Sequence, residues 1–207
     1  MGNRKGSVTR RDFLGMGMAL GGAALAGCAG SQHVGDGWQT VLNGNSLAGW
    51  SQIGFQGWSV VDGTVQGTGT TPAATGYLVS PASYTDFEIR AEFWASHDCN
   101  SGIFLRCSDR NKVGADNAYE VNIFDHRPDP SYGTGAIVNV AKVEPMPKAG
   151  NRWNIYEITA RGDHLVVVLN GQRTVDVHNG KHKAGPFALQ NGGGTVRFRR
   201  VEIRPLV

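Results

Sequence analysis

The sequence from Trp38 onward is built of short segments rich in Val, Ile, Phe, Tyr and Trp, separated by Gly, Asn, Asp and Pro. No long apolar stripe of helical period interrupts them, so the pattern predicts an all-β domain. So many strands in one domain imply a sandwich of two packed antiparallel sheets. The candidate strands are residues 38–42, 57–61, 64–68, 77–80, 85–95, 101–106, 118–124, 135–141, 153–160, 164–170, 173–178, 185–190 and 195–204.

Two turns support this interpretation. Asp62-Gly63 and Asn170-Gly171 each stand between two β-prone runs. Asp-Gly and Asn-Gly are favoured in two-residue hairpin loops, because both central residues adopt positive φ there. The sequence therefore predicts hairpins over 57–68 and 164–178.

The first 27 residues have the pattern of an export signal. A basic start precedes an uncharged run of 15 residues from Phe13 to Gly27, which is too short for the roughly 20 needed to span a bilayer. Thr9–Leu14 resembles a twin-arginine translocation motif, and Leu25–Cys28 resembles a lipobox. We therefore expect a signal at 1–27, a lipid on Cys28, a flexible tether at 28–37, a domain at 38–207, and a location on the periplasmic side of a membrane.

The charge balance changes once the signal is set aside. The remaining 180 residues carry sixteen basic and sixteen acidic side chains, so the predicted mature chain has no net charge. This removes the argument for a nucleic-acid partner and favours a neutral ligand. Cys99 and Cys107 flank a predicted strand whose ends would lie roughly 26 Å apart, against a limit near 7 Å for a disulfide. We predict two free thiols.

Strand alternation sorts the side chains by face. Ile103, Leu105, Tyr119, Val121, Ile123, Phe187 and Leu189 are predicted to face the core. The opposite face then carries Phe104, Arg106, Glu120, Asn122, Phe124, Ala188 and Gln190. An arginine, a glutamate and two amides beside aromatic rings predict a polar concavity with an aromatic floor, as sugar sites have.

Several stretches resemble the 3-keto-disaccharide hydrolase domain, also described as a 3-keto-glucoside lyase/hydratase. The resemblance covers about residues 38 to 206, and its more specific stretches are Asn100–Arg106, Tyr119–Asp125 and Gly185–Gln190. It implies a concanavalin-A-like jelly-roll β-sandwich. The chain departs from the family pattern at Val138, Gly192 and Arg200, where many relatives have tyrosine, histidine and asparagine.

The resemblance implies cleavage of a glycoside whose C3 hydroxyl has already been oxidised to a ketone. Removal of the C2 proton and elimination of the C1 substituent are followed by addition of water, which requires a base, an enolate stabiliser and an acid. Glu120 is the candidate base, and Arg106 would hold the enolate. A structural ion pair between these two residues is the alternative.

The remaining candidates are less specific. Asp125 and His126 would supply the acid, contact the substrate or bind a divalent metal that polarises the ketone, although turn chemistry is the commoner role of such a pair. Asn122 and Gln190 would bind sugar hydroxyls. Trp94 and Tyr156 would stack on a pyranose ring, although buried packing is the more frequent role of such residues. No cofactor beyond the possible metal is predicted.

Three hypotheses about function remain open. The first is a lipid-anchored enzyme that cleaves 3-keto-glycosides and depends on a separate oxidoreductase to make the keto sugar. The second is a carbohydrate-binding envelope lipoprotein with the same sandwich and no catalysis, and the third is a structural lipoprotein.

Overall fold

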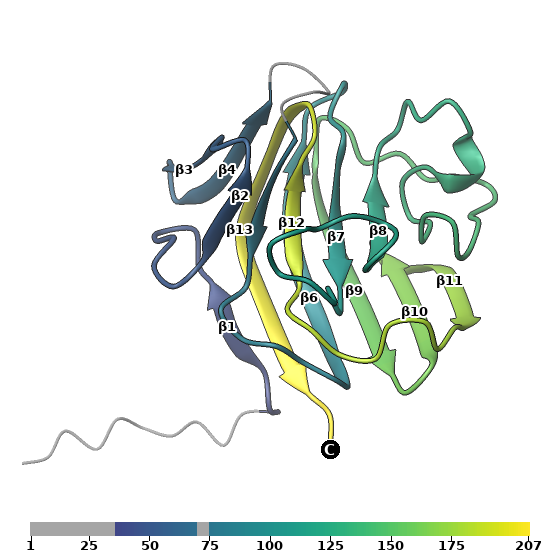
Figure 1. The fold of residues 1–207 in the computed structure, drawn as a ribbon. Coiled ribbons are helices and arrows are strands. Elements are labelled where there is room, and N and C mark those ends of the chain that lie inside the picture. Colours follow the sequence, from purple (N-terminus) through teal and green to yellow (C-terminus); the bar gives the residue numbers. More distant parts are fainter. Residues whose placement is uncertain (1–35, 70–74) are drawn as a thin grey trace, which may run out of the picture. The chain divides into compact units, whose positions relative to one another are not determined.

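A computed structural model describes residues 36–69 and 75–207. The predicted signal, Cys28 and nearly all of the predicted tether lie outside the described residues. The described chain forms thirteen strands in two antiparallel sheets and one short 3₁₀ helix, η1 (Pro130–Tyr132). Figure 1 shows how the labelled strands are arranged. Within these ranges no helix is long and apolar enough to cross a membrane. The predicted all-β jelly-roll sandwich is confirmed.

The larger sheet has eight strands and centres on β13. In spatial order β11, β10, β9, β6, β13, β4 and β3 lie side by side, and β1 pairs with the far half of β13. Long β13 can hold both β4 and β1 on one edge because each covers only part of its length. The bounds are β1 (Gln39–Leu42), β3 (Trp58–Val61), β4 (Thr64–Gly69), β6 (Phe87–Ala95), β9 (Trp153–Arg161), β10 (His164–Leu169), β11 (Gln172–His178) and β13 (Gly194–Pro205).

The smaller sheet has five strands in the order β2, β5, β12, β7, β8. Their bounds are β2 (Ser51–Gly54), β5 (Gly76–Val79), β7 (Ser101–Leu105), β8 (Tyr119–Ile123) and β12 (Ala188–Asn191). Every residue of β7, β8 and β12 is buried, so these strands are covered on both faces. Polar side chains on their outer face are therefore removed from bulk water.

The alternation predicted for these strands is confirmed. Ile103 and Leu105 join the main core between the sheets, whereas Phe104 lies in a second apolar cluster on the outer side of the smaller sheet. Both predicted hairpins form, with positive φ at Asp62-Gly63 and at Asn170-Gly171. Cys99 and Cys107 are buried free thiols, as predicted.

One predicted strand does not form, and one observed strand was not predicted. Residues 135–141 form isolated bridges instead of a strand, because Gly135 and Asn139 have positive φ and the chain folds back so that Ile137 bridges Ala141. This segment runs along the free edge of β8. Strand β2 was missed because Ser-Gln-Ile-Gly contains a single strong strand former.

Arg106 is a structural residue of this fold. Its φ of 53° ends β7 and breaks the alternation, and its side chain is fully buried. The guanidinium donates to the carbonyl oxygens of Thr85 at 2.7 Å, Gly162 at 2.6 Å and His182 at 3.2 Å, and to Asp86 Oδ1 at 3.0 Å. The prediction that Arg106 faces Glu120 is therefore wrong, because its donors are committed to three connections of the sandwich.

Tyr156 belongs to the core and does not stack on a ligand. Its ring is fully buried and stacks on Phe93, with ring centroids 5.1 Å apart. Its hydroxyl donates to the carbonyl oxygen of Asn122 at 2.6 Å, which ties β9 to β8 across the sandwich. Burial raises the pKa of Tyr156, so this hydroxyl stays a donor.

The Arg106 cluster generates a first prediction. Arg106→Met keeps an unbranched apolar side chain but removes the guanidinium from three carbonyl oxygens and from Asp86, which keeps the backbone N–H of Gly162. We expect a loss of about 3–5 kcal/mol in the free energy of unfolding, measured by urea denaturation. Arg173→Met breaks the exposed ion pair with Asp176 and is the control, with an expected change of about 1 kcal/mol or less. Equal losses in the two variants would contradict the structural role of Arg106.

Tyr156 generates a second prediction. Tyr156→Phe removes only the hydroxyl and should lower the free energy of unfolding by about 0.5–1.5 kcal/mol, because the buried carbonyl oxygen of Asn122 loses one donor and keeps the backbone N–H of Gly135. Calorimetric titration with a sugar ligand should show unchanged affinity. A variant of normal stability that has lost affinity would instead support direct contact between Tyr156 and sugar.

Candidate functional site

The candidate site lies on the outer face of the smaller sheet. Gln190 on β12 pairs with Tyr77 on β5, and Glu120 on β8 pairs with Phe104 on β7. Between them stands Gly102, where an added Cβ would lie 3.4 Å from Cγ of Glu120 and 3.6 Å from the Phe104 ring. The Glu120 side chain thus leans over β7 at the one position that has no side chain. We call these five residues the Glu120 site.

Glu120 supplies the carboxyl group of the site. Its side chain comes from a strand buried on both faces, and the residue is 8% exposed. Burial raises the pKa of Glu120 to about 7, against the opposing effect of the Arg127 charge. A carboxyl group with this pKa is partly deprotonated at neutral pH and can take a proton there, as a general base must.

Tyr77 is a site residue that the sequence predictions missed. Its ring packs edge-on against Phe104, with ring centroids 5.3 Å apart. Burial raises the pKa of Tyr77, Gln190 acts in the opposite direction, and the negative charge of Glu120 adds to the increase. The Tyr77 hydroxyl therefore remains protonated at neutral pH and can donate a hydrogen bond beside the Glu120 carboxylate. Its alternation with buried Leu78 in the predicted strand was the signal that pointed to it.

The two predicted amides differ in their availability. Gln190 is 8% exposed, and its Oε1 has no hydrogen-bond partner within the described part of the chain. Asn122 is fully buried, and its Nδ2 donates to the carbonyl oxygen of Tyr132 at 2.7 Å. Gln190 is thus the amide of the Glu120 site, whereas Asn122 holds η1 against β8.

The predicted aromatic partner Trp94 lies elsewhere. Phe93 on β6 points into the core, so Trp94 faces outward from the larger sheet, on the opposite side of the sandwich from Glu120. The guanidinium of Arg197 lies over its ring at 5.2 Å. Phe104 does not provide an exposed aromatic floor either, because it is only 1% exposed.

Asp125 is committed to structure. Its Oδ1 accepts from the Thr134 hydroxyl at 2.6 Å, and its Oδ2 accepts from the backbone N–H groups of Ala149 at 3.0 Å and Gly150 at 2.9 Å. A carboxylate with these three donors fixes the connection between β8 and β9. The predicted role as an acid is not supported by this geometry.

His126 lies at the end of β8 beside His97, with ring centroids 4.3 Å apart. Its Nε2 is 3.5 Å from Nδ1 of His97. No group of three or more His, Cys, Asp or Glu side chains in residues 36–69 and 75–207 is placed to hold a metal ion. The residues predicted as metal ligands therefore do not fit a divalent metal, since Asp125 already accepts from its own loop.

The three departures from the family pattern fall in different places. The backbone N–H of Val138 donates to the carbonyl oxygen of Glu120 at 2.9 Å, so this position adjoins the Glu120 site. Gly192 lies against Asn100, at the end of the smaller sheet. Arg200 is on the larger sheet, where it pairs with Glu202. Of the three, only Val138 adjoins Glu120 directly.

Solved structures with the same fold include proteins described as acting on or binding carbohydrate. A "putative glycosyl hydrolase" from Parabacteroides distasonis superimposes with a TM-score of 0.73 at 19% identity, over 83% of this chain and 94% of that chain. A second from the same organism gives 0.67 at 22% identity, over 82% and 99%. The carbohydrate-binding module CBM66 from Bacillus subtilis gives 0.58 at 20% identity, over 81% and 95%. At these identities the likeness concerns the fold.

Among curated proteins, no sequence matches this chain. The family model of the 3-keto-alpha-glucoside-1,2-lyase-like domain matches residues 37–204, which spans both sheets and the whole Glu120 site. The match agrees with the resemblance carried by Asn100–Arg106 and Tyr119–Asp125. The chain belongs to the 3-keto-alpha-glucoside-1,2-lyase-like family.

Proposed function

We propose that this protein cleaves the glycosidic bond of a sugar that carries a ketone at C3. The observation that supports this most directly is a buried carboxyl group, Glu120, whose pKa of about 7 suits a base at neutral pH. Family membership supports the substrate class, and the fold shared with proteins described as glycosyl hydrolases agrees with it.

The reaction begins with proton transfer from C2 to the Glu120 carboxylate. The C3 ketone acidifies this proton, and the electron pair left behind is shared with the ketone oxygen as an enolate. The enolate then re-forms the ketone and expels the C1 oxygen with its substituent, which leaves a double bond between C1 and C2. The leaving oxygen takes up a proton and departs as an alcohol, and the Glu120 carboxyl group, which holds the proton from C2, would supply it. Water adds across this bond, with OH at C1 and H at C2, and gives the free 3-keto sugar.

Tyr77 takes the stabilising role first predicted for Arg106. The enolate oxygen needs a nearby donor that is still protonated when the base is not. The raised pKa of Tyr77 meets this condition, since burial raises it and the charge of Glu120 adds to the increase. Gln190 would orient a sugar hydroxyl through its unpartnered Oε1.

The proposed setting is the cell envelope. Export through the twin-arginine motif and lipid attachment at Cys28 would hold the domain on the periplasmic side of a membrane. An oxidoreductase acting on the C3 hydroxyl must supply the keto sugar, because the elimination cannot start from an unoxidised glycoside. We therefore propose such an enzyme as a functional partner.

A carbohydrate-binding protein without catalysis is the second candidate. The observation that favours it is Val138, which replaces the frequent tyrosine at a position adjoining Glu120. The shared fold with CBM66 is compatible with this function. Both candidates bind sugar, so they differ in turnover alone.

The proposal predicts the behaviour of Glu120→Gln. This change keeps the shape of the side chain and removes the base, so kcat/KM on a 3-keto-disaccharide should fall about 10²–10⁴-fold. Affinity for an unreactive sugar should stay nearly unchanged by calorimetry. Glu144→Gln, at an exposed residue, is the control and should leave both quantities as in the wild type. No turnover by the wild-type protein, with sugar binding retained, would favour the second candidate.

The pKa of Glu120 predicts two dependences on pH. Activity should rise as the pH approaches about 7 and level off above it, because the base must be deprotonated. Stability should move in the opposite direction. The pKa of Glu120 is 4.5 in the unfolded chain and about 7 in the folded chain, so between these pH values only the folded state holds the proton. The free energy of unfolding should therefore fall by up to about 3 kcal/mol as the pH rises from 4.5 through 7.

Urea denaturation from pH 4 to 8 measures this change. In Glu120→Gln the free energy of unfolding should not show this fall above pH 5. The rest of its dependence on pH should match that of the wild type. Identical stability profiles for the two proteins would show that Glu120 titrates near its ordinary pKa.

A further inference from the structure

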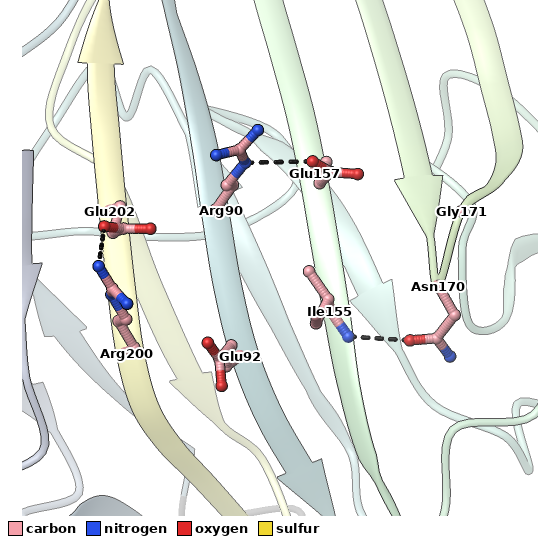
Figure 2. A pocket seen from close by; sticks show the side chains of 8 residues that line it. All are labelled: Arg90, Glu92, Ile155, Glu157, Asn170, Gly171, Arg200 and Glu202. Atoms are coloured by element: carbon pink, nitrogen blue, oxygen red, sulfur yellow. Dashed lines mark hydrogen bonds and ion pairs between the residues drawn. The ribbon is translucent and has the colours of Figure 1, made fainter. Parts of the chain in front are cut away.

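A polar groove lies on the outer face of the larger sheet (Figure 2). Glu120 belongs to the smaller sheet, on the other side of the sandwich. Its volume is about 220 Å³. Side chains from β6, β9, β13 and the β10–β11 turn line it. They are Arg90, Glu92, Ile155, Glu157, Asn170, Gly171, Arg200 and Glu202.

The floor of this groove is apolar. Ile155, in the interior of β9, is 44% exposed, and Gly171 at the adjoining turn has open space where a side chain would stand. Asn170 Oδ1 accepts from the backbone N–H of Ile155 at 2.9 Å and fixes the turn beside it. An aliphatic side chain is therefore presented at the bottom of a groove whose walls are charged.

The walls alternate in charge from strand to strand. Arg90 stands between Glu202 and Glu157 in the ladder, and its Nε is 3.1 Å from Glu157 Oε1. Arg200 Nη2 is 2.5 Å from Glu202 Oε1, and Glu92 pairs with Arg199 at the edge. With Arg199 included, three arginines face three glutamates, so the groove does not select a charged ligand.

Indole rings flank the groove at both ends. Trp153, 39% exposed, precedes Ile155 by two residues and so shares its face of β9, and the guanidinium of Arg199 lies 4.4 Å from its ring centroid. At the other end the guanidinium groups of Arg90 and Arg204 lie 4.3 Å and 5.0 Å from the ring centroid of Trp38. The planar donors and acceptors beside the apolar floor match a sugar ring, which presents C–H groups on its faces and hydroxyls at its edge.

We propose that this groove is a second carbohydrate site that binds one unit of a neutral glycan, apart from the Glu120 site. Its volume is below the roughly 300–1,000 Å³ of drug-sized pockets, which is why we infer a single unit. The inference does not rest on the elimination chemistry, because it needs no base and no ketone. Such a site would hold one part of a glycan on the domain while another part of the same glycan is cleaved.

The test uses neutral trisaccharides without a ketone, namely maltotriose, cellotriose and laminaritriose, which the proposed elimination cannot consume. In a titration followed by NMR, at least one should shift the amide signals of Ile155 and Asn170 and the indole signal of Trp153. The expected dissociation constant is about 1 mM. The same shifts should persist in Glu120→Gln, which separates this site from the catalytic one.

Ile155→Arg fills the groove and should weaken binding at these signals at least about tenfold. Val60→Arg is the matched control, because Val60 is also 44% exposed on a strand of the same sheet but lies outside the groove. Both variants should turn over a 3-keto-disaccharide as the wild type does. If Ile155→Arg fails to fold, Ile155→Ser removes the floor with less strain.

Three results would overturn the inference. They are the absence of shifts at the groove with all three sugars, equal binding by wild type and a folded Ile155 variant, and an equal loss in Val60→Arg. A failure of turnover with groove binding intact would instead count against the proposed function alone.

Discussion

Burial of the outer face of the smaller sheet is the constraint on which the candidate chemistry depends. A β-sandwich needs only the inner faces of its sheets to be apolar, so outer-face side chains are normally solvated and keep ordinary pKa values. Here the connections on either side of β8 cover that face, and Phe104 becomes part of an apolar cluster. Glu120 is in the same layer, so its carboxyl group loses water and its pKa rises.

A buried arginine at the end of β7 and a partly buried aspartate at the end of β8 fix connections of the sandwich. Arg106 binds the β9–β10 turn and the carbonyl oxygen of His182, and Asp125 binds the backbone at Ala149 and Gly150. Each is satisfied by several hydrogen bonds, which offsets the cost of burying it. Residues of catalytic type within family motifs can therefore be conformational anchors, and only their partners reveal the difference.

The sequence predicted the structure correctly where it depends on the alternation of side chains along a strand or on the residues of a single turn. The core faces of β7 and β8 and the two hairpins follow from alternation and from Asp-Gly and Asn-Gly, and all were predicted correctly. Alternation failed at Arg106 because a single positive φ, which no residue pattern announces, turned its side chain away.

The composition of the candidate site could be predicted only in part, because alternation assigns a face of a strand but not the sheet to which the strand belongs. Glu120 and Gln190 were found, since their strands become neighbours of β7. Trp94 was misplaced because β6 joins the larger sheet. Tyr77 was missed because alternation with Leu78 gives the face of its side chain but does not indicate that β5 lies next to β12. Strand order depends on long-range packing, so it required the structure.

The two outer faces give two glutamates different surroundings. Glu157 and Glu120 both stand on strands and both point away from the core. Glu157 is half exposed and forms an ion pair with Arg90. Glu120 is buried, and the pKa increase from its burial exceeds the opposing effect of Arg127. The proposed base is therefore on the smaller sheet, where water is excluded, whereas the proposed glycan groove on the larger sheet has exposed ion pairs beside an apolar floor.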